Sequence, residues 1–336
     1  MIRVGIVGAT GYTALELILI LLRHPDARIT RLTSRTPESQ PVTAVHPSLR
    51  NRLELDITTY DADDFARNVD CAFCCLPHAA SSPIVRELAE RRVRVVDFSA
   101  DYRLNSLKDF TAIYQADHAD PGRLGKVPYG LPELFRPQIE TADVIANPGC
   151  FPTSAILPLA PLVREGLIQT SDIIVDSKTG VSGAGRTPKQ AFHFPECNES
   201  VAAYGVGTHR HGPEISQIVG RWSGHQIDCV FVPHLIPMTR GILSTIYVHP
   251  AGKNHSDSIA KFLTGFYQNS PFVRCSEHLP QTADVSGTNF CDMTVRKVGN
   301  RVAIVSVIDN LIKGASGAAV QNMNVAFGLS ETVALR

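Results

Sequence analysis

The first half of the chain alternates short apolar runs with segments of helical periodicity. Helices are predicted at 13–25, where the pattern stops at Pro25, and at 81–92. Apolar strands that alternate with helices are typical of a parallel sheet with helices on both faces. We therefore predict an α/β domain over residues 1–148, with strands at 2–9, 27–35, 69–76, 93–99 and 143–148.

The second half of the chain shows longer strand patterns and fewer helical ones. Such a pattern indicates an α+β domain with a mostly antiparallel sheet, which we place at 149–312. A last segment, 313–336, contains a helical pattern at about 315–328. The strands predicted for the second domain lie at 172–180, 228–237, 241–250, 291–298 and 301–310.

The composition is that of a globular protein without a charge bias. Apolar residues make up 44% of the 336 positions and charged residues 19%, which suffices for a sizeable core. Because 32 basic residues balance 32 acidic ones, we expect neither nucleic acid nor a membrane surface as a partner. The start of the chain lacks a signal-peptide pattern, and no apolar run approaches the ~20 residues that span a bilayer. We therefore expect a cytoplasmic protein.

Eight cysteines are too few for a disulfide scaffold in a chain of this length. Cys71, Cys74 and Cys75 resemble a metal cluster, but strand alternation would place Cys74 opposite the other two. No second cysteine pair follows at zinc spacing. We interpret the three as buried strand residues and expect no metal site.

Gly5, Gly8 and Gly11 follow the first predicted strand and precede the first predicted helix. Glycines at this turn let the backbone approach a pyrophosphate, which the helix N-terminus then stabilises. The spacing differs from the commoner G-x-G-x-x-G, and a simple tight turn is the alternative. We predict a dinucleotide site in a Rossmann-like domain.

The end of the second predicted strand carries Thr33, Ser34 and Arg35. An NAD site usually presents Asp or Glu there, for the ribose 2′-hydroxyl. A hydroxyl and a guanidinium suit a 2′-phosphate instead, through charge-assisted hydrogen bonds. We predict NADP as the cofactor; the alternative is that Arg35 is only a solvated loop charge.

Cys150 stands in "NPGCFPT", residues 147–153, between a Pro-Gly turn and a second proline. A helix that begins with Pro152 would put Cys150 at or next to its N-cap. Unpaired N–H groups and the helix dipole there favour a thiolate and could stabilise an oxyanion. Beside an NADP site, such a nucleophile predicts thioester formation coupled to hydride transfer. The alternative is a buried cysteine beside a turn.

His209 and His211 precede a helix that we expect to begin near Pro213. Histidine is the usual partner of a thiol and the usual group for proton transfer at neutral pH. In an extended segment the two side chains would point to the same side. We favour His211 as the acid–base because it lies closer to the helix start, although the sequence leaves His209, and a structural role for both, open.

Two further loops offer anion-binding side chains. Arg103 ends "SADYR", which follows a strand of the first domain, where ligands of parallel sheets collect. Arg186 lies in "SKTGVSGAGRTP", residues 177–188, a loop of small residues that could wrap an anion or lie against a nicotinamide. Both arginines could instead be surface charges.

Segments spread over nearly the whole chain resemble one family, the N-acetyl-gamma-glutamyl-phosphate reductases of arginine biosynthesis. Aspartate-semialdehyde dehydrogenases share the "GATG" and Gly-Cys elements but match "THRHGPEI" far less well. The segments that carry the resemblance are "GATGYTALEL", "DFSADYRL", "NPGCFPT", "SKTGVSGAGRTP", "AYGVGTHRHGPEI", "PHLIPMTRGIL" and "DNLIKGASGAAVQNMN".

The resemblance implies a role for each matched residue. Cys150 is the expected nucleophile, and the expected acid–base is His211 or His209. Substrate contacts are expected from Arg103, Asn147 and Arg186. The segment 313–336 is expected to return to the NADP-binding domain. Cofactor contacts are expected from Gly8, Thr10, Gly11, Tyr12, Thr13, Ser34, Arg35, Ser99, Ser182, Gly183, Asn310 and Gly314.

The resemblance also implies a reaction, the NADPH-dependent reduction of N-acetyl-L-glutamyl 5-phosphate to the 5-semialdehyde through a cysteine thioester. It implies a small-molecule acyl-phosphate substrate and a homodimer or homotetramer. Alternatives are a reductase of aspartyl phosphate or of carrier-bound aminoadipyl phosphate. A non-catalytic NADP-binding redox sensor would not need a nucleophile, a base and a phosphate clamp together.

Overall fold

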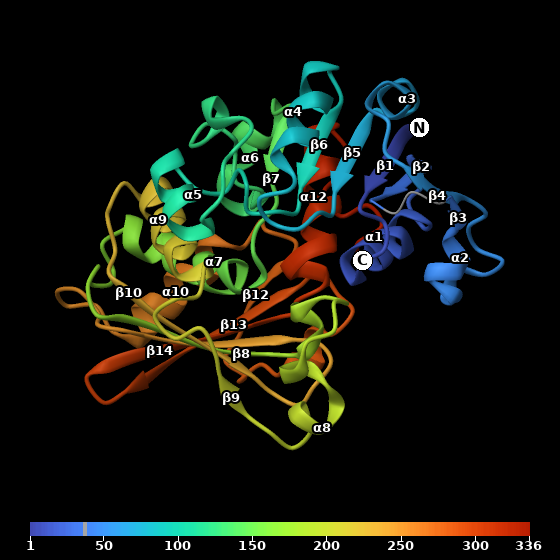
Figure 1. Ribbon diagram of the computed structural model, residues 1–336. Coiled ribbons are helices and arrows are strands. Elements are labelled where there is room, and N and C mark those ends of the chain that lie inside the picture. The colour runs from blue at the N-terminus through green and yellow to red at the C-terminus, as the bar shows by residue number, and fades with distance from the viewer. Residues whose placement is uncertain (36–38) are drawn as a thin grey trace. The chain divides into compact units, whose positions relative to one another are not determined.

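The computed structural model describes residues 1–35 and 39–336. The chain divides into two compact units (Figure 1). The first unit comprises Met1–Pro148 and Ala315–Arg336, and the second comprises Gly149–Gly314.

The first unit is built on a mainly parallel sheet with the strand order β3-β4-β2-β1-β5-β6-β7. The central strand β1 (Ile2–Val7) pairs parallel with β2 and with β5, while the short β3 pairs antiparallel with β4. The other strands are β2 (Ala27–Ser34), β3 (Gln40–Pro41), β4 (Asp56–Thr59), β5 (Cys71–Cys74), β6 (Arg94–Asp97) and β7 (Val144–Ala146).

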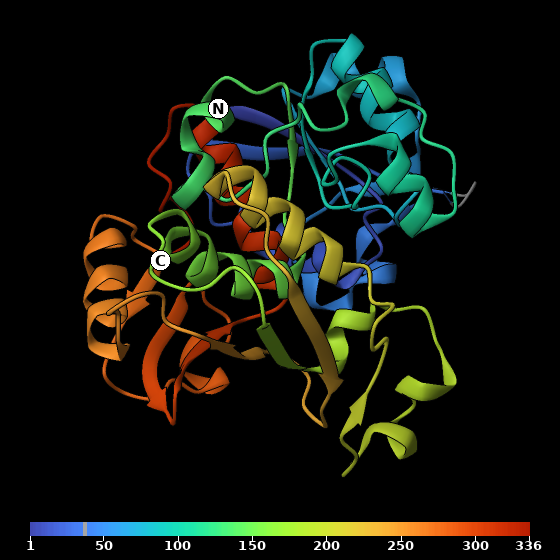
Figure 2. The ribbon, with the colours of Figure 1, turned by 90° about the vertical axis from the view of Figure 1, so that its left-hand side faces the viewer.

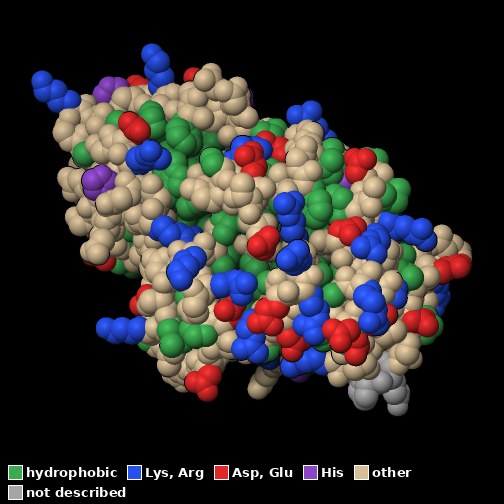
Figure 3. Space-filling model, turned by 90° about the horizontal axis from the view of Figure 1, so that it is seen from above, with side chains coloured by type: hydrophobic (Ala, Val, Ile, Leu, Met, Phe, Trp, Pro, Cys, Tyr) green, Lys and Arg blue, Asp and Glu red, His purple; other side chains and the backbone are tan. Residues whose placement is uncertain are grey.

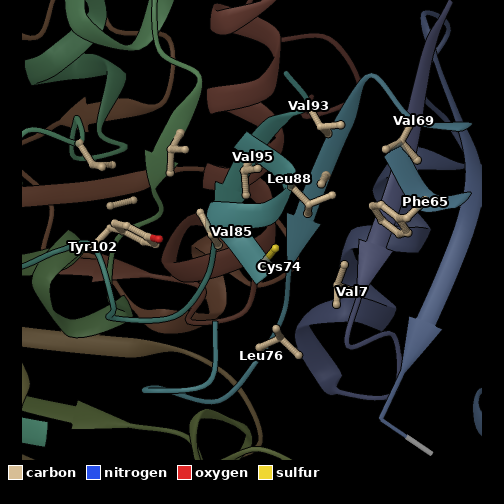
Figure 4. Close-up of a cluster of buried hydrophobic side chains, with 14 residues drawn as sticks. Val7, Phe65, Val69, Cys74, Leu76, Val85, Leu88, Val93, Val95 and Tyr102 are labelled. Carbon is tan, nitrogen blue, oxygen red and sulfur yellow. The ribbon is translucent and has the colours of Figure 1, made fainter. Parts of the chain in front are cut away.

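Helices of the first unit pack against this sheet. Side chains of two of them, α3 and α4, point at strands β1, β5 and β6 and form a buried apolar cluster with them (Figure 4). Another helix, α12, packs against α1 and α6. The helices are α1 (Tyr12–Leu21), α2 (Val42–Val45), α3 (Ala62–Asn68), α4 (Ser82–Glu90), α5 (Leu107–Tyr114), α6 (Pro132–Glu140) and α12 (Gly317–Ala326).

The second unit is built on a mostly antiparallel sheet with the order β12-β13-β14-β11-β8-β10-β9. The pairs β12–β13 and β8–β10 are parallel, and the other neighbours are antiparallel. The strands are β8 (Ile173–Thr179), β9 (Ala202–Ala203), β10 (Cys229–Leu235), β11 (Ile242–Val248), β12 (Val273–Cys275), β13 (Cys291–Val298) and β14 (Arg301–Ile308). The predicted fold class, a parallel α/β domain plus an α+β domain, is confirmed.

The longest helix of the second unit, α7, packs against α9, α10 and strand β11. The segment that carries α8 and β9, yellow-green in Figure 2, lies at the edge of the sheet because β9 is the last strand in the order. The helices are α7 (Cys150–Arg164), α8 (Phe194–Cys197), α9 (His211–Ser223), α10 (Ser256–Phe266) and α11 (Thr282–Val285).

Two helices begin earlier than the sequence predicts. The helix expected from Pro152 starts at Cys150, and the helix expected near Pro213 starts at His211. Proline is tolerated within the first turn because the N–H that it lacks has no partner there anyway. Cys150 and His211, two of the three candidate catalytic residues, are therefore first residues of helices.

Basic and acidic side chains are interspersed over the face drawn in Figure 3, in keeping with the zero formal net charge. Within residues 1–35 and 39–336, no helix is long and apolar enough to cross a membrane.

Candidate active site and cofactor loop

The glycine loop connects β1 to α1 and is held by the end of β2. The amides of Gly8 and Ala9 both donate to the carbonyl of Thr33, each at 2.9 Å. Gly8 has a φ of +86°, and a Cβ there would lie 2.5 Å from the backbone oxygen of Cys75. Only glycine can adopt this left-handed conformation without strain and also allow so close an approach of the Cys75 backbone.

Gly11 precedes the first turn of α1 and leaves open space at its Cα. A Cβ built at Gly11 finds its nearest described neighbour, the Thr13 hydroxyl, at 3.9 Å. In the described part of the chain no side chain caps α1, so its first N–H groups point outward without an intrahelical partner. An uncapped helix start with room for a backbone contact suits an anionic group such as a pyrophosphate.

The end of β2 presents polar groups beside this loop. Ser34 is buried and Arg35, the next residue, is exposed. The Thr33 hydroxyl is buried and finds no hydrogen-bond partner within 1–35 and 39–336. A hydroxyl and a guanidinium next to one another can bind a phosphate dianion.

Ser99 lies in a buried network after β6. Its hydroxyl donates to Asp97 at 2.6 Å and accepts the amide of Asp101 at 3.0 Å. Burial, together with the charge of Asp101, raises the pKa of Asp97 to about 6. The Asp101 carboxylate accepts three amides at the start of α4, from Ala79, Ser81 and Ser82. Ser99 is thus tied to the loop in which it lies.

Arg103 and Asn147, both predicted to contact substrate, are buried in the first unit. The Arg103 guanidinium donates to the carbonyls of Asn147, at 2.8 Å, and Phe98, at 2.7 Å. The Asn147 amide donates to the carbonyl of Ala315 at 3.0 Å. These contacts hold the chain just before Pro148.

Cys150 is the first residue of α7, and Gly149 is its N-cap. The Gly149 amide donates to a carboxylate oxygen of Glu214 on α9 at 3.0 Å. On the sheet side, Ser154, one turn into α7, bonds to Ser244 of β11 at 2.7 Å, and Ser244 bonds to Ser177 of β8 at the same distance. Buried polar groups therefore fix the start of this helix on two sides.

His209 and His211 lie next to Phe151, the neighbour of Cys150. Their ring centroids are 4.8 Å apart, and each is within 6 Å of the Phe151 ring. The segment is not extended as predicted, because the amide of His209 closes a turn onto the carbonyl of Gly205. The two rings lie side by side because His209 ends this turn and His211 starts α9.

The two imidazoles differ in their hydrogen bonding. The His209 Nδ1 accepts the backbone amide of His211 at 3.1 Å, so neutral His209 carries its proton on Nε2. Burial, with the charge of Arg210 as the second cause, lowers the pKa of His209 to about 4. His209 is therefore neutral at pH 7 and offers an N–H donor.

The remaining predicted residues of the second unit lie in two connected turns. Asn310 is buried, donates to the Ser182 hydroxyl at 2.9 Å and accepts the amide of Gly241 at 2.7 Å. Gly183 follows Ser182 in a short 3₁₀ helix, and Arg186 beyond it is exposed. These contacts join the turn at 181–184 to the end of β14.

Gly314 lies in a π-helical turn, Ile312–Ser316, directly against the cysteine. A Cβ at Gly314 would be 2.8 Å from the Cβ of Cys150. The Asp309 carboxylate shapes this turn by accepting the amides of Leu311, at 2.8 Å, and Ile312, at 3.1 Å. The glycine is required for close packing rather than for a positive φ.

Two residues near the cysteine were not singled out from the sequence. Burial, with the nearby Cys150 as the second cause, raises the pKa of the Tyr204 hydroxyl, whose ring contacts His209 at a centroid distance of 5.4 Å. Glu214 is buried and bonds to Gly149, as described above. Both lie in "AYGVGTHRHGPEI", but only their contacts in the folded structure distinguish them from the other residues of that segment.

Metal binding would need several ligands together. The described ranges, 1–35 and 39–336, contain no group of three or more His, Cys, Asp or Glu side chains placed to hold a metal ion.

Comparison with family models identifies the class. Residues 3–142 match the model described as "Semialdehyde dehydrogenase, NAD binding domain", and residues 150–310 match "Semialdehyde dehydrogenase, dimerisation domain". Crystal structures of aspartate semialdehyde dehydrogenases share the fold. The enzyme from Candida albicans, solved with NADP, has a TM-score of 0.73 at 15% identity and covers 99% of both chains. The enzyme II from Vibrio cholerae, complexed with ASA, has a TM-score of 0.71 at 16% identity and covers 98% of both.

Sequence relatives narrow the class further. The N-acetyl-gamma-glutamyl-phosphate reductase of Rhodopirellula baltica is 54% identical over 99% of this chain and 98% of its own length. That of Desulforudis audaxviator is 45% identical over 100% of this chain and 98% of its own. The chain belongs to the N-acetyl-gamma-glutamyl-phosphate reductase family, as its sequence motifs predict.

Proposed function

We propose that this chain reduces N-acetyl-L-glutamyl 5-phosphate to N-acetyl-L-glutamate 5-semialdehyde with release of phosphate. The observation that carries the proposal is the position of Cys150 at the start of α7, with two histidines against the adjacent Phe151. The 54% identity to a reductase of this substrate supports the choice among acyl phosphates.

The cofactor is NADP, and its reduced form, NADPH, supplies a hydride when it is bound. The open, uncapped start of α1 at Gly11 fits the pyrophosphate, since a glycine there admits close backbone contact. We assign the 2′-phosphate to Ser34 and Arg35, because β2 ends without an acidic residue. Thr10, Tyr12, Thr13, Ser99, Ser182, Gly183, Asn310 and Gly314 complete the proposed set of cofactor-binding residues. The first unit is thus the proposed cofactor-binding domain and Gly149–Gly314 the proposed catalytic domain.

Cys150 is the proposed nucleophile. Its sulfur attacks the acyl carbon, the bond from that carbon to the phosphate oxygen breaks, and phosphate leaves with both electrons of that bond. Backbone N–H groups at the first turn of α7 lie where they can stabilise the negative oxygen formed during attack. Hydride addition to the thioester carbonyl, with a proton from the acid–base group, gives a thiohemiacetal on Cys150. Return of that proton to the acid–base group as the C–S bond breaks releases the aldehyde and regenerates the thiolate.

The two histidines take different proposed roles. His209 is neutral with its proton on Nε2, so it suits donation of a hydrogen bond to a substrate oxygen. We assign proton transfer to His211, which the start of α9 holds beside the same phenylalanine. Arg103, Asn147 and Arg186 are the proposed substrate-binding residues. For Arg103 and Asn147, their buried hydrogen bonds favour a role in shaping the segment before Cys150.

We also propose a homodimer or homotetramer, since residues 150–310 match a dimerisation domain. A cytoplasmic location remains a prediction from the sequence.

The reverse reaction tests the function. NADP is mixed with N-acetyl-glutamate semialdehyde and inorganic phosphate, and NADPH formation is followed at 340 nm. We expect phosphate-dependent reduction of NADP, and much slower reduction with aspartate semialdehyde under the same conditions. Faster turnover of aspartate semialdehyde would assign the chain to that substrate. Binding of NADP without turnover of either aldehyde would support the redox-sensor alternative.

A further inference from the structure

A buried histidine contacts the glycine loop from outside the segments already described. His46 follows α2 and is only 3% exposed. Its Nε2 lies 2.8 Å from the carbonyl oxygen of Ala9, between Gly8 and Thr10. A carbonyl oxygen only accepts hydrogen bonds, so the His46 Nε2 carries a proton and donates.

The position of His46 is fixed by its own segment. Its amide donates to the carbonyl of Val42 at 2.8 Å, and its carbonyl accepts the amide of Leu49 at 3.0 Å. Val42 and Leu49 are both fully buried. Pro47 disfavours the α-helical conformation at the preceding residue, and His46, with a φ of −124° and a ψ of 82°, lies outside it and ends α2. The imidazole is therefore presented to the loop from a firmly packed segment.

The contact orients a peptide group of the loop. Peptide bonds of the described residues are trans, so the N–H of Thr10 points to the opposite side of the Ala9–Thr10 peptide from the Ala9 carbonyl. With the carbonyl held by His46, this N–H is directed away from the histidine. The amides of Gly8 and Ala9 are already bound to the Thr33 carbonyl. The loop is thus held by two sets of contacts. The Thr33 carbonyl of β2 binds the amides of Gly8 and Ala9, and His46 binds the carbonyl of Ala9.

We propose that His46 is a positioning residue of the cofactor site, which fixes the Ala9–Thr10 peptide so that the part of the loop after Ala9 presents its amides to the pyrophosphate of NADP. The inference rests on the proposed cofactor role of this loop. Without the donor, the buried Ala9 carbonyl would lose its partner, and the peptide would rotate or the loop would shift to satisfy it.

The test is the dissociation constant of NADPH, measured by fluorescence titration. His46→Leu removes the donor, and we expect the constant to rise about tenfold or more. His46→Gln places a donor near the position of Nε2, and we expect it to stay within about threefold of the wild-type value. His46→Asn is polar but too short to reach Ala9, so it should resemble His46→Leu.

Adenosine 2′-monophosphate provides the second measurement, because it carries the 2′-phosphate but no pyrophosphate. Its dissociation constant, determined by competition, should change less than about twofold in all three variants. His24 provides the matched control. It is a buried histidine of the same unit whose Nε2 bonds to Asn324 at 2.9 Å. His24→Leu should destabilise the fold but leave NADPH binding nearly unchanged.

The outcomes separate the possibilities. NADPH binding by His46→Leu at wild-type strength would overturn the proposal, and so would an equal loss in His24→Leu. An equal loss with His46→Gln and His46→Leu would show that the shape of the ring matters and not the donor. If His46→Leu does not fold, the comparison of His46→Asn with His46→Gln decides. A wild-type protein that does not bind NADPH would refute the cofactor assignment itself.

Discussion

The helices α1 and α7 both start directly after a glycine, and their first turns are surrounded very differently. At the start of α1, Gly11 faces open space and has its nearest described neighbour, Thr13, at 3.9 Å from a built Cβ. At the start of α7, the amide of Gly149 is bound by Glu214, and Gly314 packs against Cys150. The first terminus has room for a ligand, whereas the second holds one side chain in place.

The comparison teaches that a helix N-terminus has no function by itself. The partial positive charge at its end is the same in both helices. What differs is whether the surrounding chain admits an outside anion or positions an internal thiol. This difference supports our proposal that α1 binds the cofactor and that α7 carries the nucleophile. Five experiments would contradict or refine this contrast.

The largest effect is expected at the α7 terminus. Cys150→Ser should lower turnover by ~10³-fold or more, because a serine hydroxyl has no comparable anionic population at pH 7. NADPH binding should remain nearly intact, since the glycine loop belongs to the other unit. Steady-state kinetics and a binding titration on the same preparation check both parts. Near-normal turnover would remove the covalent mechanism.

Replacement of each of the two histidines near α7 should have a different kinetic effect. His211→Asn should lower kcat by ~10²-fold or more, as expected for loss of an acid–base group, and should shift the pH profile of alkylation of Cys150. His209→Asn should act mainly on KM, because a neutral donor that binds substrate contributes before the chemical step. If neither variant alters kcat or the alkylation profile, proton transfer belongs to a residue outside this segment.

At the cofactor side, Arg35→Ala should weaken NADPH far more than NADH. The loss of a charge-assisted contact to phosphate corresponds to about 1.5–3 kcal/mol in binding free energy. Parallel titrations with the two cofactors measure the difference. An equal loss for both would mean that Arg35 does not bind the 2′-phosphate.

A pair of glycine substitutions tests the contrast between the two termini directly. Gly11→Ala should leave the free energy of unfolding nearly unchanged, because a methyl group fits there. It should weaken NADPH binding about tenfold, because the methyl group would occupy the space proposed for the pyrophosphate. Gly314→Ala should lower the free energy of unfolding by ~1–3 kcal/mol and alter the alkylation rate of Cys150, because its methyl would overlap the cysteine. Urea denaturation and iodoacetamide kinetics provide the readouts. Loss of stability in Gly11→Ala would contradict the open space at α1.

The smallest effect is the contribution of His209 to pH-dependent stability. Its folded-state pKa of about 4 lies below the usual value of 6.5. Between these values the unfolded chain binds a proton that the folded chain excludes, so stability falls as pH decreases from 6.5 towards 4. His209→Asn should flatten this slope in urea titrations at pH 7, 5.5 and 4.5. An unchanged slope would show that His209 is not the group responsible.

The fold class and several chemical features followed from local patterns. Continuous apolar strands between helices predicted the parallel sheet around β1, and the long strands after residue 172 predicted the antiparallel one. The starts of two helices were predicted about two residues too late. A proline in the first turn resembles a helix boundary in the sequence, although it lies inside the helix. The side chains of His209 and His211 were predicted to point to the same side of an extended segment. In the structure a turn brings their rings together instead.

The sequence by itself determined which residues are candidates for reactive chemistry: a cysteine after a Pro-Gly turn, a histidine pair, a glycine loop and a strand end with Arg35. These signals are local, because backbone conformation and side-chain type are encoded within a few neighbouring residues. Tertiary structure alone decided which carboxylate binds Gly149, which glycine packs on Cys150 and which histidine holds the Ala9 carbonyl. Those partners are between 37 and 164 residues apart in the chain, so only folding can bring together their hydrogen-bonding groups and close-packed atoms.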